Sequence, residues 1–226
     1  MQQCSWHHTS IARLSEDYPM VKLHTNYGVI TLELFADKAP VTVENFKQYV
    51  RDGHYDGTIF HRVISNFMIQ GGDIENGDGT GGYAAKWYGQ GDQNDPKTYV
   101  VPDEFSPDRR HYVGALAMAN SGVNTAGSQF YIVDKEASDS SSGEAGTHWL
   151  NGYDQNGQAK SCGSQGVSCH TVFGQVKQGM EVIDAIAVLP TGASENFPSD
   201  VTQPLIAITS MTQMTDNRFS SWPVDA

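Results

Sequence analysis

Two segments of this chain, residues 60–73 (FHRVISNFMIQGGD) and 118–131 (MANSGVNTAGSQFY), restrict its fold more than any other feature. Both are rich in β-forming residues, which are interrupted by an arginine or by amides and by bare glycines. A glycine within a strand lets a ligand or a neighbouring backbone approach closely. The pattern therefore predicts strands whose exposed face lines a shallow, partly apolar groove.

The length of 226 residues is enough for one well-buried domain, and no part of the sequence indicates a second core. Hydrophobic residues at 38% and charged residues at 18% are values typical of a globular protein. The 23 glycines favour a fold rich in turns and strands, so we expect an all-β or α+β domain.

The charge balance disfavours two classes of partner. With 26 acidic and 14 basic residues, the formal net charge is −12, which repels phosphate backbones and anionic lipid. No apolar run is long enough to span a bilayer, and residues 1–19 lack the apolar centre of a signal peptide. We therefore expect no nucleic-acid or membrane partner and a cytoplasmic location.

The hydrophobic pattern predicts the order of the secondary structure. Helical periodicity at residues 40–53 and 180–188 predicts two amphipathic helices, one early and one late. Alternating or short apolar runs bounded by turn residues predict strands at residues 21–25, 29–35, 58–64, 67–71, 112–119, 128–133, 172–176 and 205–211.

Cys162 and Cys169 have six residues between them, in a loop rich in glycine, serine and glutamine. Three interpretations are open: free thiols, a local disulfide, and a metal site that also uses His170. A zinc site needs about four ligands, and this spacing matches no common zinc motif. Because cytoplasmic thiols are usually reduced, we expect free thiols.

The order and spacing of FHR, MIQGGD, GTGG, MAN and GSQF resemble the central signatures of the cyclophilins, the peptidyl-prolyl cis-trans isomerases. The resemblance covers about residues 20–212 and implies a mainly β fold: a closed eight-stranded antiparallel barrel capped by two α-helices. Residues 1–19 are then an N-terminal extension and residues 213–226 a C-terminal tail. Residues 134–147 and 151–169 depart from the compact family pattern and read as polar surface insertions.

The chemistry that the resemblance implies is rotation about the bond preceding proline, whose barrier is about 20 kcal/mol. No bond needs to break. A donor that hydrogen-bonds the proline nitrogen helps, because that nitrogen loses resonance during rotation. The resemblance assigns this role to Arg62, whose guanidinium is always charged and offers several N–H groups. It also places Gln70 and His61 in the catalytic set.

The resemblance implies a wider substrate-binding set. Four of its side chains form an apolar pocket for the proline ring, and the others line the groove with amides, small residues, an indole and an imidazole. The set is Phe67, Met68, Ala119, Asn120, Ser121, Gln129, Tyr131, Trp149, Leu150 and His170. Tyr131 stands where phenylalanine is most familiar, so its hydroxyl must find a hydrogen-bond partner. Trp149 matches the residue that contacts cyclosporin in sensitive members.

We therefore expect a monomeric isomerase that acts on proline-containing peptides and folding proteins, needs no cofactor or metal, and binds cyclosporin. The alternative is a non-catalytic proline-peptide-binding or chaperone module on the same fold. The presence of Arg62, Gln70 and Met68 favours the enzyme.

Overall fold

The computed structural model describes residues 19–135, 149–192 and 207–214. Nearly all of the expected N-terminal extension (1–19) and C-terminal tail (213–226) lies outside these residues, as does most of the insertion at 134–147. No helix among the described residues combines the length and the apolar character that crossing a membrane requires.

The strands and the two α-helices of the described chain follow the order that the hydrophobic pattern predicts, and short 3-10 turns lie between some of them. The helices are α1 (Pro40–Arg51), α2 (Met180–Ala187) and the 3-10 turn η1 (Pro96–Thr98). The strands are β1 (Met20–Thr25), β2 (Gly28–Leu34), β3 (Arg62–Ile64), β4 (Met68–Gly71), β5 (Ala115–Met118), β6 (Phe130–Val133), β7 (Val172–Gln178) and β8 (Ile208–Met214).

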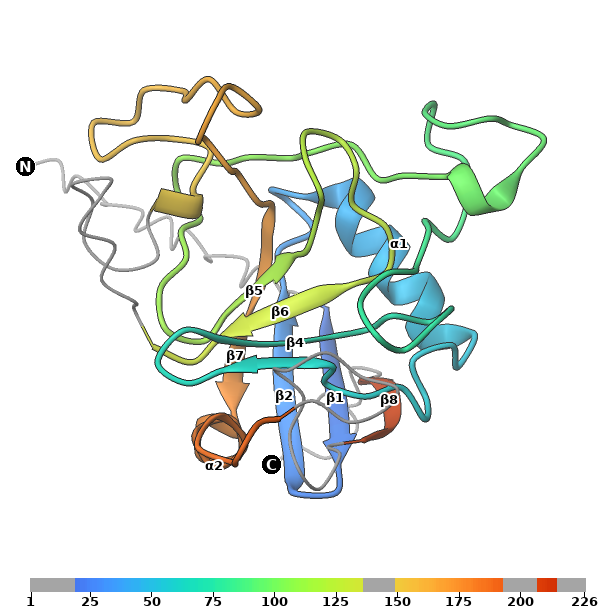
Figure 1. Cartoon of the computed structure of the whole chain (residues 1–226), viewed down its shortest axis with the longest axis vertical. Helices are drawn as coiled ribbons and strands as arrows, with labels where there is room; N and C mark the ends of the chain where they lie inside the picture. The colour runs from blue at the N-terminus through green and yellow to red at the C-terminus, as the bar shows by residue number, and fades with distance from the viewer. Residues whose placement is uncertain (1–18, 136–148, 193–206, 215–226) are drawn as a thin grey trace, which may run out of the picture.

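The eight strands form one antiparallel sheet in the order β3-β4-β6-β5-β7-β2-β1-β8 (Figure 1). The mainly β architecture with two helices is therefore confirmed, but the prediction of a closed barrel is wrong for the described residues. The end strands β3 and β8 share no ladder in this part of the chain, so the sheet is an open half-barrel.

A short contact joins the two ends of the sheet. Within the part of the chain that the structure describes, one bridge, Ile59 with Ala207, links the segments that precede β3 and β8. The amide of Ile208 donates to the carbonyl of Thr58 at 2.7 Å, and the amide of Gly57 donates to the carbonyl of Ile208 at 2.8 Å. Extending this antiparallel register into β3 would require residues 202–204, which lie outside the described residues.

The last strand extends beyond its predicted end. The apolar run predicted a strand at residues 205–211, of which 205 and 206 lie outside the described residues, whereas β8 extends to Met214. At the last described position of the strand, Met214 pairs with Met20, the first residue of β1. Pairing with a neighbouring strand, which hydropathy does not report, accounts for the additional residues.

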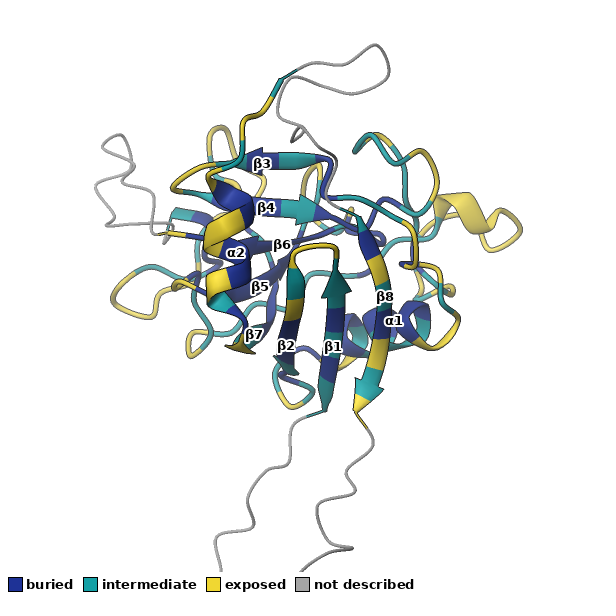
Figure 2. Cartoon of the chain, turned by 90° about the horizontal axis from the view of Figure 1, so that it is seen from below, coloured by how far each residue is buried: buried dark blue, intermediate teal, exposed yellow. Residues whose placement is uncertain are grey.

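Both helices bury most of the apolar residues that predicted them, although Val188, at the end of the second predicted helix, is 68% exposed. Val43, Phe46 and Val50 of α1 are buried in the main core, and so are Ile183 and Ile186 of α2. Figure 2 shows the two helices on opposite sides of the strand pair β1 and β2. The two helices contribute side chains to the same core, which they share with the strands.

The first turn of α1 is capped by a residue distant in sequence. Ala39, at the N-cap, makes no side-chain hydrogen bond. Instead, the carboxylate of Glu104 accepts the amides of Val41 at 3.1 Å and Thr42 at 2.8 Å, together with the Thr42 hydroxyl at 2.8 Å. An anion here also suits the positive end of the helix dipole.

The sheet has an apolar cluster on each face, because successive side chains of a strand point to opposite sides. Ile69, Leu116 and Ile132 belong to the main core between the sheet and the helices. Strand residues on the opposite face, together with Phe35 and Leu150 from the loops, form a second buried cluster against which Phe67 and Trp149 pack: Phe35, Met68, Ala115, Ala117, Tyr131, Val133, Leu150 and Val172. This second cluster forms the floor of the candidate site.

Candidate active site

Strand register aligns the polar and apolar parts of the site in one row across five strands. Arg62 of β3 pairs with Gln70 of β4, and Gln70 pairs with Tyr131 of β6. Tyr131 pairs with Ala117 of β5, which in turn pairs with Val172 of β7. Because paired residues point to the same face of a sheet, the row places a cation, an amide and an aromatic ring side by side.

A cavity of about 350 Å³, here called the groove cavity, opens over this row. Its lining residues are Arg62, Phe67, Met68, Gln70, Ala119, Asn120, Tyr131, Trp149, Leu150 and His170. The structure thus brings ten of the thirteen residues expected from the sequence into the wall of a single cavity. The other three are Ser121, Gln129 and His61.

The floor of the groove cavity is apolar. Met68, Tyr131 and Leu150 are almost fully buried. At the rim, the ring of Phe67 stacks on that of Trp149, with 6.3 Å between centroids and 26° between planes. Such a floor favours a compact apolar ring, because burial removes its surface from water.

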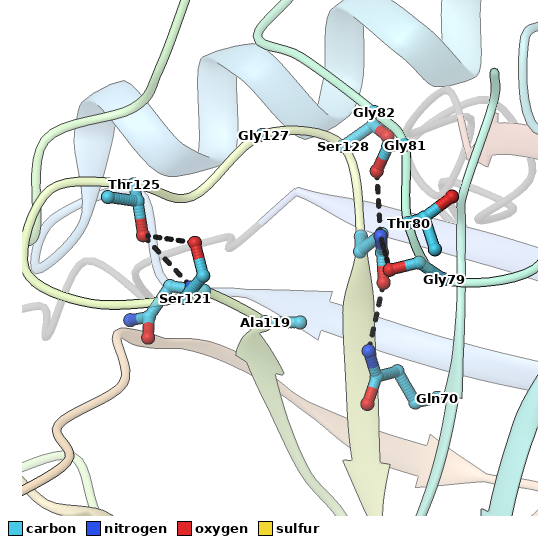
Figure 3. Close-up of a pocket in the computed structure, with 12 residues that line it drawn as sticks. Gln70, Gly79, Thr80, Gly81, Gly82, Ala119, Ser121, Thr125, Gly127 and Ser128 are labelled. Carbon is cyan, nitrogen blue, oxygen red and sulfur yellow. Dashed lines mark hydrogen bonds between the residues drawn. The ribbon is translucent and has the colours of Figure 1, made fainter. Parts of the chain in front are cut away.

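A chain of amides holds the polar wall. Nε2 of Gln70 donates to Oε1 of Gln129 at 2.9 Å, so the amide oxygen of Gln70 faces Arg62, whose Nη1 lies 3.5 Å away. Nε2 of Gln129 donates to the carbonyls of Gly79 at 3.0 Å and Gly81 at 2.7 Å (Figure 3). These bonds fix which end of each amide points into the groove.

A second cavity of about 230 Å³, here called the amide cavity, adjoins the first. Ser121 and Gln129 line it, and it shares Gln70, Ala119 and Asn120 with the groove cavity. The residues that sequence reasoning missed here are Gly79, Thr80, Gly81, Gly82, Thr125, Gly127 and Ser128. The GTGG run at 79–82 was noted as a family signature, but its sequence did not indicate that these residues line a cavity.

Buried Asp73 organises the glycine-rich wall of the amide cavity. Its carboxylate accepts the backbone amides of Glu75, Asn76, Gly79 and Gly81, at 2.9 to 3.1 Å. Burial opposes ionisation of this carboxyl, but the four amide donors outweigh it and lower the pKa of Asp73. An ionised Asp73 therefore keeps the Gly79 and Gly81 carbonyls in reach of Gln129.

Asn120 and His170 hold the opposite wall. Nδ2 of Asn120 donates to the carbonyl of Cys169 at 2.9 Å. Nδ1 of His170 lies 2.9 Å from the Met118 carbonyl, which can only accept, so this nitrogen carries a proton. Burial lowers the pKa of His170, so Nε2 is unprotonated near neutral pH and accepts the Ser168 hydroxyl at 3.1 Å.

His61 lies outside the lining of both cavities. Its ring is almost fully buried behind the glycine-rich wall, and a Cβ added to Gly79 would lie 2.9 Å from it. Burial lowers the pKa of His61, which favours the neutral ring. The structure therefore places His61 behind the site.

His111 and Asn151 were missed by sequence reasoning, although both are buried directly beneath the groove cavity. The Tyr131 hydroxyl lies 2.8 Å from Nε2 of His111, and Nδ1 of His111 lies 2.7 Å from Oδ1 of Asn151. Tyr131 replaces the familiar phenylalanine, and the hydrogen-bonding requirement of its hydroxyl was the one available signal. That requirement predicted a partner but did not identify it.

Cys162 and Cys169 form a disulfide, so the expectation of free thiols is wrong in this structure. Their Cα atoms are 5.6 Å apart, within the range that a disulfide needs. The turn of the loop brings them together, which the cysteine spacing by itself did not determine. Across residues 19–135, 149–192 and 207–214, no cluster of three or more His, Cys, Asp or Glu side chains suits a metal ion.

Comparisons with known proteins agree with this geometry. The family model described as cyclophilin type peptidyl-prolyl cis-trans isomerase/CLD matches residues 20–213. Peptidyl-prolyl cis-trans isomerase-like 1 of Mus musculus is 38% identical over 184 residues, which cover 81% of this chain and 88% of the mouse protein.

A longer relative from Streptococcus pyogenes carries a name that pairs a phosphatase with a peptidyl-prolyl cis-trans isomerase. It is 40% identical over 190 residues, which cover 81% of this chain but only 37% of the length of that relative.

Among solved structures, a cyclophilin type isomerase from Cryptosporidium parvum, determined in the presence of the dipeptide Ala-Pro, matches with a TM-score of 0.62 and 26% identity. The match covers 87% of this chain and 99% of that one. With the family model matched over residues 20–213, the chain belongs to the cyclophilin type peptidyl-prolyl cis-trans isomerases.

Proposed function

We propose that this isomerase accelerates rotation about X-Pro bonds by donating a hydrogen bond from Arg62 to the proline nitrogen while the groove cavity holds the proline ring. The observation that carries the proposal is the row Arg62, Gln70 and Tyr131 across β3, β4 and β6. It places a permanent cation beside an apolar floor, with an amide between them.

The apolar floor supports binding of the proline side. Met68, Tyr131 and Leu150 line the groove cavity with apolar groups, and the stacked rings of Phe67 and Trp149 lie at its rim. A relative was solved in the presence of Ala-Pro, and we extend that ligand class to this chain: proline-containing peptides and folding proteins.

The polar wall supports the rotation step. The amide oxygen of Gln70 faces Arg62 and Gln129 fixes Gln70, so the guanidinium is oriented before the peptide arrives. As the C–N bond twists, the proline nitrogen loses resonance and becomes a better acceptor, so an Arg62 donor binds the transition state more tightly than the ground state. No proton transfer is required.

An Arg62 hydrogen bond would supply only part of the acceleration. Shortening an exchange time of about 10 to 100 s to milliseconds takes roughly 7 kcal/mol. One charged hydrogen bond contributes about 1.5 to 3 kcal/mol. Burial of the ring and the preoriented amides would supply the remainder.

Isomerisation of a proline tetrapeptide, measured for wild type and three variants, tests the proposal. We expect Arg62→Ala to lose roughly 10²- to 10³-fold in kcat/KM, by analogy with deleting one preorganised donor. Arg62→Lys should retain part of the activity, because lysine keeps the charge but not the planar fork. Arg51→Ala, at an exposed arginine on α1, is the matched control. More than half of wild-type activity in Arg62→Ala would remove Arg62 from the mechanism.

A further inference from the structure

A third cavity of about 330 Å³, here called the loop cavity, lies on the other side of Asn120. Its lining is Asn120, Ser121, Gly122, Val123, Gly163, Ser164, Gly166, Val167, Ser168 and Cys169. Asn120 lines all three cavities, so the loop cavity continues the groove rather than standing apart from it. Most of its wall comes from the insertion at 151–169, which departs from the compact pattern of the family.

The wall formed by the insertion is held in a defined shape. The disulfide between Cys162 and Cys169 closes the loop, which Figure 1 shows in orange above the start of β7. Inside the loop, the amide of Gly163 donates to the carbonyl of Val167 at 3.0 Å, and the amide of Val167 donates to that of Ser164 at 2.9 Å. A cavity with fixed walls binds at lower entropic cost than one that must order on binding.

The loop closed by the disulfide also approaches Val123 and Asn120, which line the other side of the loop cavity. On one side, Gly163 approaches the opposite wall so closely that an added Cβ would lie 2.6 Å from Cγ2 of Val123. On the other side, the carbonyl of Cys169 accepts the amide of Asn120 at 2.9 Å, and the next residue, His170, lines the groove cavity. The Asn120–Cys169 hydrogen bond and the adjacent His170 therefore connect the loop directly to the wall of the groove cavity.

The lining residues indicate which class of side chain the loop cavity would bind. None of its ten residues carries a charge. Val123 and Val167 supply apolar surface, while Ser121, Ser164 and Ser168 supply hydroxyls. A volume of about 330 Å³ is at the low end for a ligand site, which suits one or two side chains rather than a large molecule. A charged side chain would lose hydration there without gaining an opposite charge from the lining.

We propose that the loop cavity is an additional substrate subsite that takes an uncharged side chain, such as valine or threonine, of the same peptide whose proline occupies the groove cavity. This inference rests on the proposed function, because it needs a proline peptide in the groove. An extended chain advances about 3.3 Å per residue. A short peptide centred on proline fills only the groove, whereas a longer one passes Asn120 and reaches the subsite.

Isomerisation of two kinds of peptide tests the subsite. The short probe is Ala-Ala-Pro-Phe, and the long probes are decapeptides with the same centre that carry valine, threonine or aspartate at each flanking position in turn. We expect one flanking position at which valine and threonine raise kcat/KM about tenfold over aspartate. Val123→Asp and Val167→Asp should abolish that preference and leave the short probe within twofold of wild type.

The matched control is Val188→Asp, which adds the same charge at a valine that is 68% exposed at the end of α2 and lines none of the three cavities. It should leave both probes unchanged. Methyl NMR provides a binding readout: the Val123 and Val167 signals should shift with the preferred decapeptide and not with the short probe.

The outcomes separate this inference from the proposed function. If wild type fails to accelerate the short probe, the proposed function fails. If the short probe is isomerised but no flanking position shows the preference, or if Val123→Asp leaves the preference intact, the subsite is overturned. Methyl shifts that depend on protein concentration without peptide would instead assign the loop cavity to self-association, and would also overturn it.

Discussion

The hydroxyl of Tyr131 and Nε2 of His111 lie 2.8 Å apart beneath the groove cavity. Oδ1 of Asn151 accepts both the backbone amide of His111 at 3.0 Å and its Nδ1 at 2.7 Å. An amide oxygen only accepts, so Nδ1 carries the proton and Nε2 of a neutral ring accepts the Tyr131 hydroxyl. The hydroxyl therefore engages His111, while the ring of Tyr131 still lines the cavity.

Tyr131→Phe should lower stability while largely preserving catalysis. The substitution keeps the ring that lines the groove but leaves Nε2 of buried His111 without this donor, so we expect a loss of about 1 to 2 kcal/mol in the free energy of unfolding. Activity should stay within about threefold, because the aromatic face is unchanged. Denaturant titration and the tetrapeptide assay measure the two effects. A large fall in kcat/KM with unchanged stability would show that the hydroxyl itself acts on the substrate.

Cyclosporin should inhibit this isomerase through Trp149, in line with the contact that the family resemblance implies. Trp149→Phe keeps a ring to stack on Phe67 but removes the indole N–H, so drug affinity should fall roughly three- to tenfold, the equivalent of about 0.5 to 1.5 kcal/mol. Peptide isomerisation should change less, because Arg62 is the catalytic donor in our proposal. Inhibition titrations check this. Equal drug affinity in wild type and variant, or none in either, would contradict it.

Stability should fall as the pH drops below about 6.5, through His61 and His170. Burial lowers the pKa of both rings in the folded state. Below pH 6.5, the ordinary value for an unfolded histidine, the unfolded chain therefore binds more protons, and the free energy of unfolding decreases until the pH passes the folded pKa values. Denaturant titrations at pH 7.5, 6.5 and 5.5 measure the trend. NMR midpoints at or above 6.5 for these two rings would contradict it.

Opening the disulfide should destabilise the protein. Closing a loop between Cys162 and Cys169 restricts the unfolded chain, and loop-closure entropy for so short a loop corresponds to about 2 kcal/mol. We expect the double variant Cys162→Ser, Cys169→Ser to lose about this much in the free energy of unfolding. Cys4→Ser, which removes the remaining cysteine, is the control. Wild-type stability in the double variant, or the same loss in the control, would rule out a stabilising role for the bridge.

The sequence by itself determined the local elements and most of the groove lining. The resemblance to the cyclophilin signatures is why Met68, Gln70 and Tyr131 were expected to lie together in one groove, and the pairing of β4 with β6 places Gln70 beside Tyr131. Helical periodicity predicted the buried faces of α1 and α2. Periodicity depends on residues a few positions apart, which is the range over which a hydrophobic pattern carries information.

Only the tertiary structure decided the contacts between residues far apart in the chain. Glu104 caps α1 from 62 residues away, and His111 meets Tyr131 from a loop with no periodicity. Among the described residues, β3 and β8 share no ladder, which the predicted closed barrel would require. The disulfide and the loop cavity depend on how an insertion folds back toward Val123. Hydrogen bonds and cavities of this kind arise from geometry in three dimensions, so neighbouring residue types do not specify them.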